Sequence, residues 1–135
     1  MIASTKGRYA LRVLVDMAES SIEGEYVALK DIASRQGISE KYLEAIMKIL
    51  VEKKLVQGHR GKGGGYRLVK KPQDYTAGEI IRAAEGNLAP VACLVPGAAK
   101  CERYDKCRTV GMWEKLDTIV SDYLDSIKLT DLMQS

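Results

Sequence analysis

Apolar residues recur at steps of three and four along most of this chain, which is the spacing that places them on one face of an α-helix. A first helix is predicted after Ser4 or Thr5, either of which can cap it, and a short second helix ends at Gly37. Ser39 then opens a third helix, whose buried face consists of Leu43, Ile46, Met47, Leu50 and Val51. Two short helices joined by a tight glycine-containing turn form a helix-turn-helix, although an ordinary amphipathic helix hairpin has the same pattern.

The pattern changes to short strands after residue 54. Residues 55–57 and 66–69 are predicted to pair as strands, and the segment between them is rich in glycine. Residues 58–71 contain five lysines and arginines and no acid, so the hairpin is strongly basic. A thin basic hairpin can enter the minor groove of DNA, where Arg60 would meet a concentrated negative potential. A phosphate-binding loop is the competing interpretation, but its Gly-x-x-x-x-Gly-Lys-Ser/Thr pattern is absent from the sequence.

Two further helices are predicted beyond the hairpin. The first begins with a capping box at Thr76 and Glu79 and ends at Gly86. The second is long and begins near Thr109. Its apolar residues alternate at steps of three and four, the seam pattern of a coiled coil: Trp113, Leu116, Val120, Tyr123 and Ile127. We expect this seam to form a homodimer contact, because dimeric DNA-binding proteins recognise half-sites one turn apart. Packing of the seam inside one chain is the alternative.

Composition and charge narrow the class of protein. A chain of 135 residues with 46% hydrophobic and 29% charged residues is one globular domain, or a small domain with an added arm. Residues 1–71 carry fourteen Lys/Arg and eight Asp/Glu, a net of +6, whereas residues 72–135 carry seven and ten, a net of −3. The basic first half suits a polyanion. The sequence has no apolar run that predicts a membrane span, and its N-terminus lacks the apolar core of a secretory signal, so we expect a cytoplasmic protein with reduced thiols.

Together these patterns predict a mainly α fold with a small β-hairpin. Residues 1–86 are assigned to a winged helix-turn-helix DNA-binding domain, residues 87–108 to a cysteine loop, and residues 109–135 to a dimerisation helix and tail. In such a domain the second helix of the helix-turn-helix lies in the major groove, with its N-terminal residues facing the base edges. The candidate contacts with double-stranded DNA therefore come from the third helix and the hairpin: Ser39, Lys41, Tyr42, Arg60 and Lys62.

All three cysteines of the chain lie between residues 93 and 107, in a segment whose Pro-Gly step marks a loop. Thiols grouped in a loop can converge on a soft metal ion or an iron–sulfur cluster, so Cys93, Cys101 and Cys107 are candidate ligands. Their odd number argues against a simple disulfide framework. Three unrelated thiols are the alternative. An enzyme with a nucleophilic cysteine is disfavoured, because such catalysis needs an adjacent base and the only histidine, His59, lies in the hairpin.

Four features occur together in this chain. They are the run Ser4-Thr-Lys-Gly-Arg-Tyr-Ala10, the run Gly37-Ile-Ser-Glu-Lys-Tyr-Leu-Glu44, the hairpin tip Arg60-Gly-Lys-Gly-Gly-Gly-Tyr66, and the three-cysteine loop before a long helix. In combination they resemble the Rrf-type family of winged-helix transcriptional regulators. The resemblance implies a homodimeric bacterial regulator on a palindromic operator, with Lys41 and Tyr42 in the major groove and Arg60 in the minor groove.

The same resemblance implies a cofactor. It suggests a 2Fe–2S cluster bound by Cys93, Cys101 and Cys107, whose occupancy controls the choice of DNA. The family members that look most similar are of the IscR type, which sense cluster supply and regulate the genes of iron–sulfur cluster assembly. We therefore expect a transcriptional regulator of this kind.

Two departures from the family pattern leave the fourth ligand of such a cluster unassigned. IscR-type members have a histidine three residues after the last cysteine, where this chain has Val110, and other members can use an acid near the N-terminus, where this chain has Arg8. Glu102, Asp105 and Glu114 are the nearby candidates. Residues 75–86 also resemble CymR-type repressors of cysteine metabolism. The alternative is thus a cluster-free repressor that acts through thiol oxidation or a partner enzyme.

Overall fold

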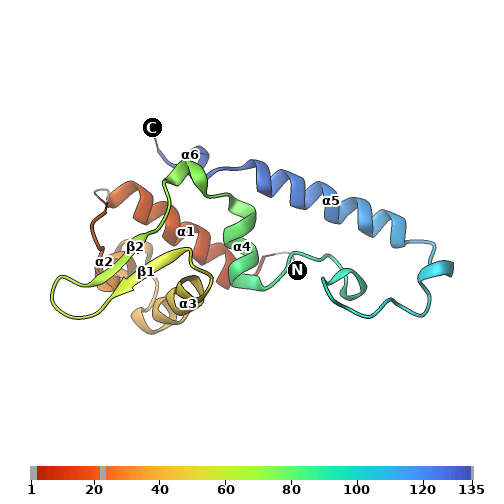
Figure 1. Cartoon of the computed structure of the whole chain (residues 1–135), viewed down its shortest axis with the longest axis horizontal. Helices are drawn as coiled ribbons and strands as arrows, with labels where there is room; N and C mark the ends of the chain where they lie inside the picture. Colours follow the sequence, from red (N-terminus) through yellow and green to blue (C-terminus); the bar gives the residue numbers. More distant parts are fainter. Residues whose placement is uncertain (1–2, 22–23, 135) are drawn as a thin grey trace.

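The computed structural model describes residues 3–21 and 24–134, and its architecture is the predicted one, mainly α-helical with one β-hairpin (Figure 1). The helices are α1 (Thr5–Ser20), α2 (Leu29–Gln36), α3 (Glu40–Glu52), α4 (Ala77–Glu85), α5 (Val110–Ser126) and α6 (Leu129–Leu132). Short 3₁₀ turns occur at Pro72–Asp74, Ala92–Leu94 and Tyr104–Lys106. The strands β1 (Val56–His59) and β2 (Gly65–Leu68) pair antiparallel, with Val56 opposite Leu68. Within the described ranges, no helix is long and apolar enough to cross a membrane.

One hydrophobic core joins α1, α2, α3, α4 and the start of β1. The apolar face of each helix is buried there, because removing a large apolar side chain from water stabilises the fold by about 1.5–3 kcal/mol. The fully buried side chains include those of Leu14, Met17, Ile32, Met47, Leu50 and Ile80. The predicted buried face of α3 is confirmed except at its last member, because Val51 is 39% exposed.

The turn between α2 and α3 depends on a glycine. Gly37 has a φ of 64°, in the left-handed region that glycine adopts without steric cost, and its N–H donates to the carbonyl of Ala33. The end of α2 is also tied to α1 through Asp16. The buried carboxylate of Asp16 accepts hydrogen bonds from Arg35 at 2.7 Å and from Gln36 at 2.8 Å. These contacts fix α2 against α1 just before α3 begins.

The base of the hairpin is anchored by Tyr75, which is fully buried. Its hydroxyl donates to the carbonyl of Leu55 at 2.6 Å and accepts a hydrogen bond from the N–H of Val69 at 3.0 Å. Farther along β2, Tyr66 exchanges two backbone hydrogen bonds with Val27, at 2.8 and 2.9 Å. The segment before α2 therefore pairs with the outer edge of the hairpin. These two attachments set the direction in which the hairpin projects from the body of the protein, by which we mean the part built around the core of α1–α4.

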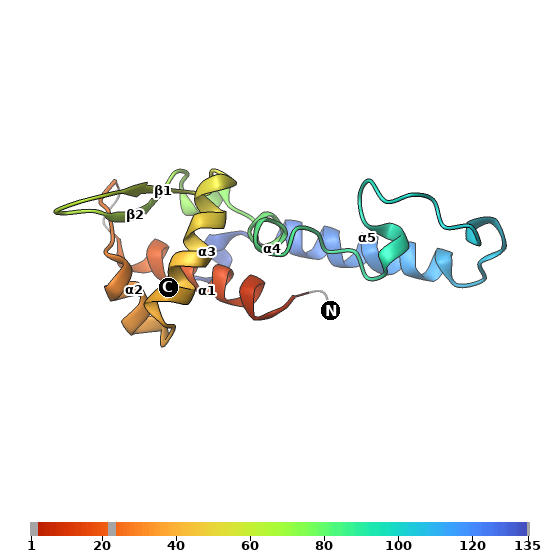
Figure 2. The same ribbon diagram turned by 90° about the horizontal axis from the view of Figure 1, so that it is seen from below.

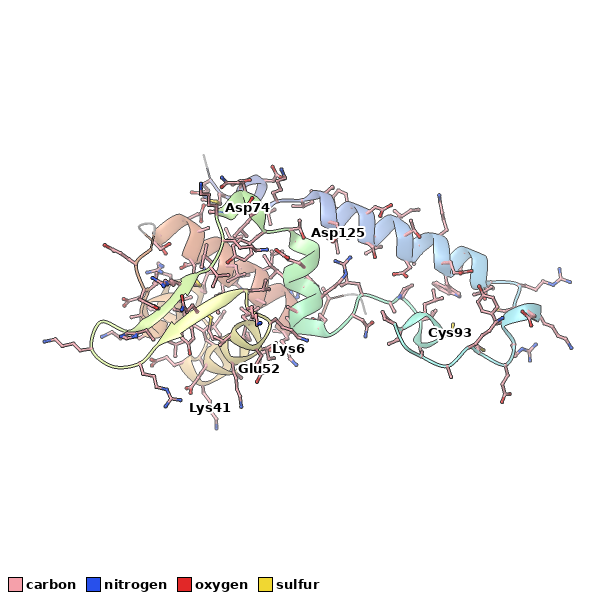
Figure 3. All side chains as sticks on the ribbon, viewed as in Figure 1. Lys6, Lys41, Glu52, Asp74, Cys93 and Asp125 are labelled. Carbon is pink, nitrogen blue, oxygen red and sulfur yellow. The ribbon has the colours of Figure 1, made fainter. Side chains whose placement is uncertain are left out.

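The cysteine loop and α5 form an arm that extends from the body (Figures 1 and 2). The arm is attached at the C-terminal end of α5. Asp125 accepts two hydrogen bonds from Arg82 of α4, at 2.7 and 2.9 Å, and the N–H of Ala77 donates to the carbonyl of Ile127 at 2.8 Å. Figure 3 shows Asp125 at this junction of α4 and α5. The start of α5 and the loop before it thus lie far from α3 and the hairpin.

Candidate DNA interface and cysteine loop

The predicted recognition helix, α3, presents its first turn to solvent. Ser39 caps this turn, because its hydroxyl accepts a hydrogen bond from the N–H of Tyr42 at 3.1 Å. Lys41 and Tyr42 are exposed, whereas the next residue, Leu43, is fully buried. Lys41 projects away from the body (Figure 3). The first turn therefore offers an ammonium group and a phenol in positions where they can reach base edges or phosphates.

The ring of Tyr42 is held in place by α1. It packs edge-on against Tyr9, with the ring centroids 5.9 Å apart and the planes at 89°. The guanidinium of Arg12 lies 5.0 Å from the centroid of Tyr9 and donates to the carbonyl of Gln36 at 2.6 Å. Tyr9 and Arg12 were not among the predicted site residues. Nothing in the local sequence could have identified their contacts with the helix-turn-helix, because Tyr42 and Gln36 lie more than twenty residues further along the chain.

The hairpin tip is basic and turns on glycines. Arg60 and Lys62 are both exposed, and neither forms a hydrogen bond or ion pair with the other residues that the structure describes. Between and after them, Gly61 and Gly63 have φ values of 95° and 75°, which glycine adopts more readily than other residues. The hairpin and α3 lie at the same end of the molecule, opposite the arm (Figure 1). The five predicted DNA contacts are therefore on two neighbouring elements.

Other polar residues of the hairpin have structural partners. The guanidinium of Arg67 lies 4.7 Å from the ring centroid of Tyr26, and it donates to the side chain of Gln57 at 3.0 Å and to the carbonyl of Gly24 at 3.2 Å. The ring of His59 packs against Tyr26 with a centroid distance of 5.2 Å. These contacts stiffen the two strands and leave the tip as the part of the hairpin that can enter a groove.

The three cysteines lie on the loop between α4 and α5. Cys93 and Cys101 are exposed, Cys107 is half-buried, and all three are free thiols. A hydrogen bond between the Cys107 sulfur and the Thr109 hydroxyl, at 3.5 Å, together with one from the Thr109 backbone, lowers the pKa of Cys107 below its usual value. The lower pKa favours the thiolate, which is the form that binds metals.

The three cysteines have the donor atoms that an iron–sulfur cluster requires, but their positions in this structure do not bring those atoms together. Three free thiols are the donor type that such clusters use. Among the residues that the structure places, however, no group of three or more His, Cys, Asp or Glu side chains lies close enough to hold a metal ion. The loop would have to fold around a cluster to bring the three sulfurs to one point.

Two of the three candidate fourth ligands have other partners. The carboxylate of Glu114 accepts a hydrogen bond from the hydroxyl of Tyr104 at 3.2 Å. Asp105 forms an ion pair with Lys100 at 3.4 Å. Glu102 is exposed and has no such interaction within the described part of the chain, so it remains the candidate that a cluster could recruit without breaking a contact.

An apolar stripe runs along α5. Of the five residues of the predicted seam, Leu116 and Tyr123 are 36% and 63% exposed, and the others are half-buried. Ile127, the last of them, lies just beyond the helix as its C-cap. Two further apolar residues of the same stripe, Met112 and Ile119, are 57% and 54% exposed. The apolar face of α5 is therefore wider than the part that the rest of the chain covers.

Comparison with known proteins identifies the family. The model of the family Rrf2, described as iron-dependent transcriptional regulator, matches residues 3–135. The chain belongs to the Rrf2 family. It is a DNA-binding transcriptional regulator and not an enzyme, as the sequence patterns predicted.

The similar proteins agree with this assignment. The HTH-type transcriptional regulator IscR of Aliivibrio salmonicida is 39% identical over 133 residues, which cover 98% of this chain and 77% of the relative. CymR, the global cysteine regulator of B. subtilis, has a similar solved structure, with a TM-score of 0.76, 35% identity, and coverage of 98% of this chain and 95% of CymR. For T. potens IscR the TM-score is 0.74, with 36% identity and coverage of 98% and 85%. These likenesses confirm the predicted fold class.

Proposed function

We propose that this Rrf2 regulator senses the supply of iron–sulfur clusters. It acts in the cytoplasm as a homodimer on a palindromic operator, holds a 2Fe–2S cluster on Cys93, Cys101 and Cys107, and controls the genes of cluster assembly. The observation that carries the proposal is the placement of all three free thiols on one solvent-facing loop, away from α3 and the hairpin. Similarity to IscR proteins supports it.

In this proposal, separate parts of the chain bind DNA, form the dimer and hold the cluster. The first turn of α3 brings Lys41 and Tyr42 into the major groove with Ser39 at its cap, while Arg60 enters the adjacent minor groove and Lys62 contacts a phosphate. The apolar stripe of α5 pairs the two chains, so that their α3 helices face successive half-sites. Cys93, Cys101 and Cys107 would hold the cluster through their thiolates, the donors that iron–sulfur clusters use.

The content of iron in anaerobically purified protein tests the cofactor. The protein should be brown and contain about two irons per chain, as a 2Fe–2S cluster requires. Cys93→Ala, Cys101→Ala or Cys107→Ala should each remove the colour. Lys41→Ala is the matched control, because it should weaken operator binding and leave the iron content unchanged. Colourless anaerobic protein with one zinc ion per chain would contradict the proposal in favour of a structural zinc site.

A cluster-free repressor of the CymR type is the second candidate. It is favoured by the likeness to B. subtilis CymR and by the separation of the three thiols in this structure. In this case thiol oxidation, or a partner enzyme docked on the acidic second half of the chain, changes the affinity for DNA. Metal-free protein whose operator affinity changes with a mild thiol oxidant, and recovers with a reductant, would establish this alternative.

A further inference from the structure

Glu85, the last residue of α4, binds the start of α1. One oxygen of its carboxylate, Oε1, accepts three hydrogen bonds: from the N–H of Ser4 at 2.7 Å, from the hydroxyl of Ser4 at 2.6 Å, and from the N–H of Gly7 at 2.8 Å. A carboxylate at this place also interacts favourably with the dipole of α1. The N-terminus of α1 is therefore capped by a residue that follows it by about eighty positions in the sequence.

The start of α1 is shaped for this contact. Ser4 occupies the N-cap position, but its hydroxyl makes no bond to its own helix, since it donates to Glu85. Gly7 is buried, and a Cβ built on it would lie 2.5 Å from Oε1 of Glu85, closer than such atoms can approach. Burial raises the pKa of Glu85, but the hydrogen bonds from Ser4 and Gly7 outweigh burial and hold the pKa below its usual value. The acceptor is thus ionised at neutral pH, which strengthens these hydrogen bonds.

From this cap, α1 leads directly to the helix-turn-helix. Tyr9, in the second turn of α1, packs against Tyr42 on the recognition helix. Arg12, one turn later, donates to the carbonyl of Gln36 at the end of α2. A shift or rotation of the start of α1 would therefore reach α3 directly through Tyr42 and also through the end of α2.

On its C-terminal side, Glu85 is close in sequence to the loop that carries the cysteines. It is followed by Gly86, which ends α4 with a φ of 93°, and then by the loop that carries all three thiols. Figure 1 shows the end of α4 beside the start of α1, with the loop leaving from the same point. Glu85 is thus the last side chain before the loop, and it touches the helix that supports Tyr42.

We propose that Glu85 is a positioning residue that transmits the state of the cysteine loop to the recognition helix. The inference rests on the proposed function, in which the state of the loop controls DNA binding, and it adds the residue that couples the two. When the loop changes conformation, the end of α4 moves and the hydrogen bonds of Glu85 with Ser4 and Gly7 change. The start of α1 then shifts, and the contact between Tyr9 and Tyr42 shifts the ring of Tyr42 on α3. Glu85 itself touches neither DNA nor the thiols.

The test compares operator affinity in two states of the loop. Operator binding by the 135-residue chain is measured without metal and after reconstitution with iron and sulfide, and the ratio of the two dissociation constants is the readout. Allosteric couplings are ordinarily about 5- to 150-fold. Glu85→Ala should bring this ratio to within about twofold of one, while the bound iron stays at the parent level. Gly7→Ala, which displaces the same carboxylate from the other side, should do the same. Glu52→Ala removes an exposed carboxylate and should keep the parent ratio.

The outcomes separate coupling from stability. If Glu85→Ala and Gly7→Ala weaken binding equally in both states and keep the parent ratio, Glu85 is only a structural cap and the inference is wrong. Glu85→Gln keeps an acceptor oxygen for the donors of Ser4 and Gly7, so it should keep the fold. It should therefore retain at least part of the parent ratio. If Glu85→Ala does not fold, Gly7→Ala decides, and a parent ratio in Gly7→Ala would overturn the inference. A parent ratio of one would instead refute the proposed function, and the inference with it.

Discussion

Arg60→Ala at the hairpin tip tests how this regulator holds DNA. The side chain is exposed and makes no contact with other described residues that its removal would break, so the free energy of unfolding should change by no more than about 0.5 kcal/mol. If the guanidinium enters a narrow minor groove, its loss should cost about 1–3 kcal/mol of binding free energy. At about 1.4 kcal/mol per tenfold change, the operator should bind about 5- to 150-fold more weakly.

Arg67→Ala is the matched control, since it removes the same charge from the same hairpin. Arg67 packs on Tyr26 and donates to Gln57 and Gly24, so its loss should lower stability, by about 1 kcal/mol for the hydrogen bonds of a half-exposed group. Its effect on DNA binding should be the smaller of the two. The comparison therefore separates an inserted side chain from a general reduction of positive charge.

The assay is a titration of a labelled operator duplex, followed by fluorescence anisotropy at several salt concentrations, with urea unfolding of each variant alongside. Arg60→Ala should also reduce the slope of log affinity against log salt by about one. The reasoning is refuted if Arg60→Ala binds as tightly as the parent at equal salt. It is also refuted if both arginine variants weaken binding equally and neither changes stability, because net charge alone would then account for the result.

Three further changes test the assembly and the stability of the body. Leu116→Asp should make the protein monomeric in light scattering, because it puts a charge in the proposed dimer contact, whereas Thr118→Asp on the polar side of α5 should leave the assembly unchanged. Tyr75→Phe should cost about 1–3 kcal/mol in urea unfolding, since it leaves buried backbone groups of the hairpin base unpaired. Burial raises the pKa of Asp16, but hydrogen bonds from Arg35 and Gln36 lower it more, so its stabilisation is present above about pH 4 and lost as the pH falls through the lowered pKa. Asp16→Asn should remove this acid-dependent loss of stability when the free energy of unfolding is measured by urea unfolding at a series of pH values.

Features that depend on neighbouring residues were predictable from the sequence. The capping box is present as expected, with the hydroxyl of Thr76 accepting from the N–H of Glu79 at 3.1 Å. Gly37 occupies the left-handed position that ends α2, and Ser39 caps α3. The bounds of the strands lie within two residues of the predicted ones. Each of these rests on local rules of backbone geometry and hydrogen bonding, so most of the order of the elements could be predicted from the sequence. The short helix α6 was not predicted, because residues 129–132 were assigned to a tail after the long helix.

Contacts between distant parts of the chain could not be predicted in this way. The sequence predicts Ser4 or Thr5 as the cap of α1. Ser4 is at the N-cap position, but its hydroxyl donates to Glu85, a partner that no local pattern reveals. The edge-on contact of Tyr9 with Tyr42 depends on how α1 crosses α3. The spacing of the cysteines likewise shows that the thiols share a loop and leaves open how that loop folds. Helix periodicity predicts an apolar stripe on α5. Which part of that stripe the rest of the chain covers depends on how α5 packs against α4, and this is not a local property of the sequence.

In the proposed function, the two attachments of the cysteine loop determine how its state reaches DNA. At one end, Tyr104 donates to Glu114 near the start of α5, which joins the loop to the proposed dimer helix. At the other end, Glu85 joins the end of α4 to α1. A change at the first attachment moves the two chains relative to each other and alters the spacing between their recognition helices. A change at the second acts within one chain, on the ring of Tyr42. Because neither attachment includes the hairpin tip, the loop can change which operator is preferred while the charge contacts that hold DNA stay in place.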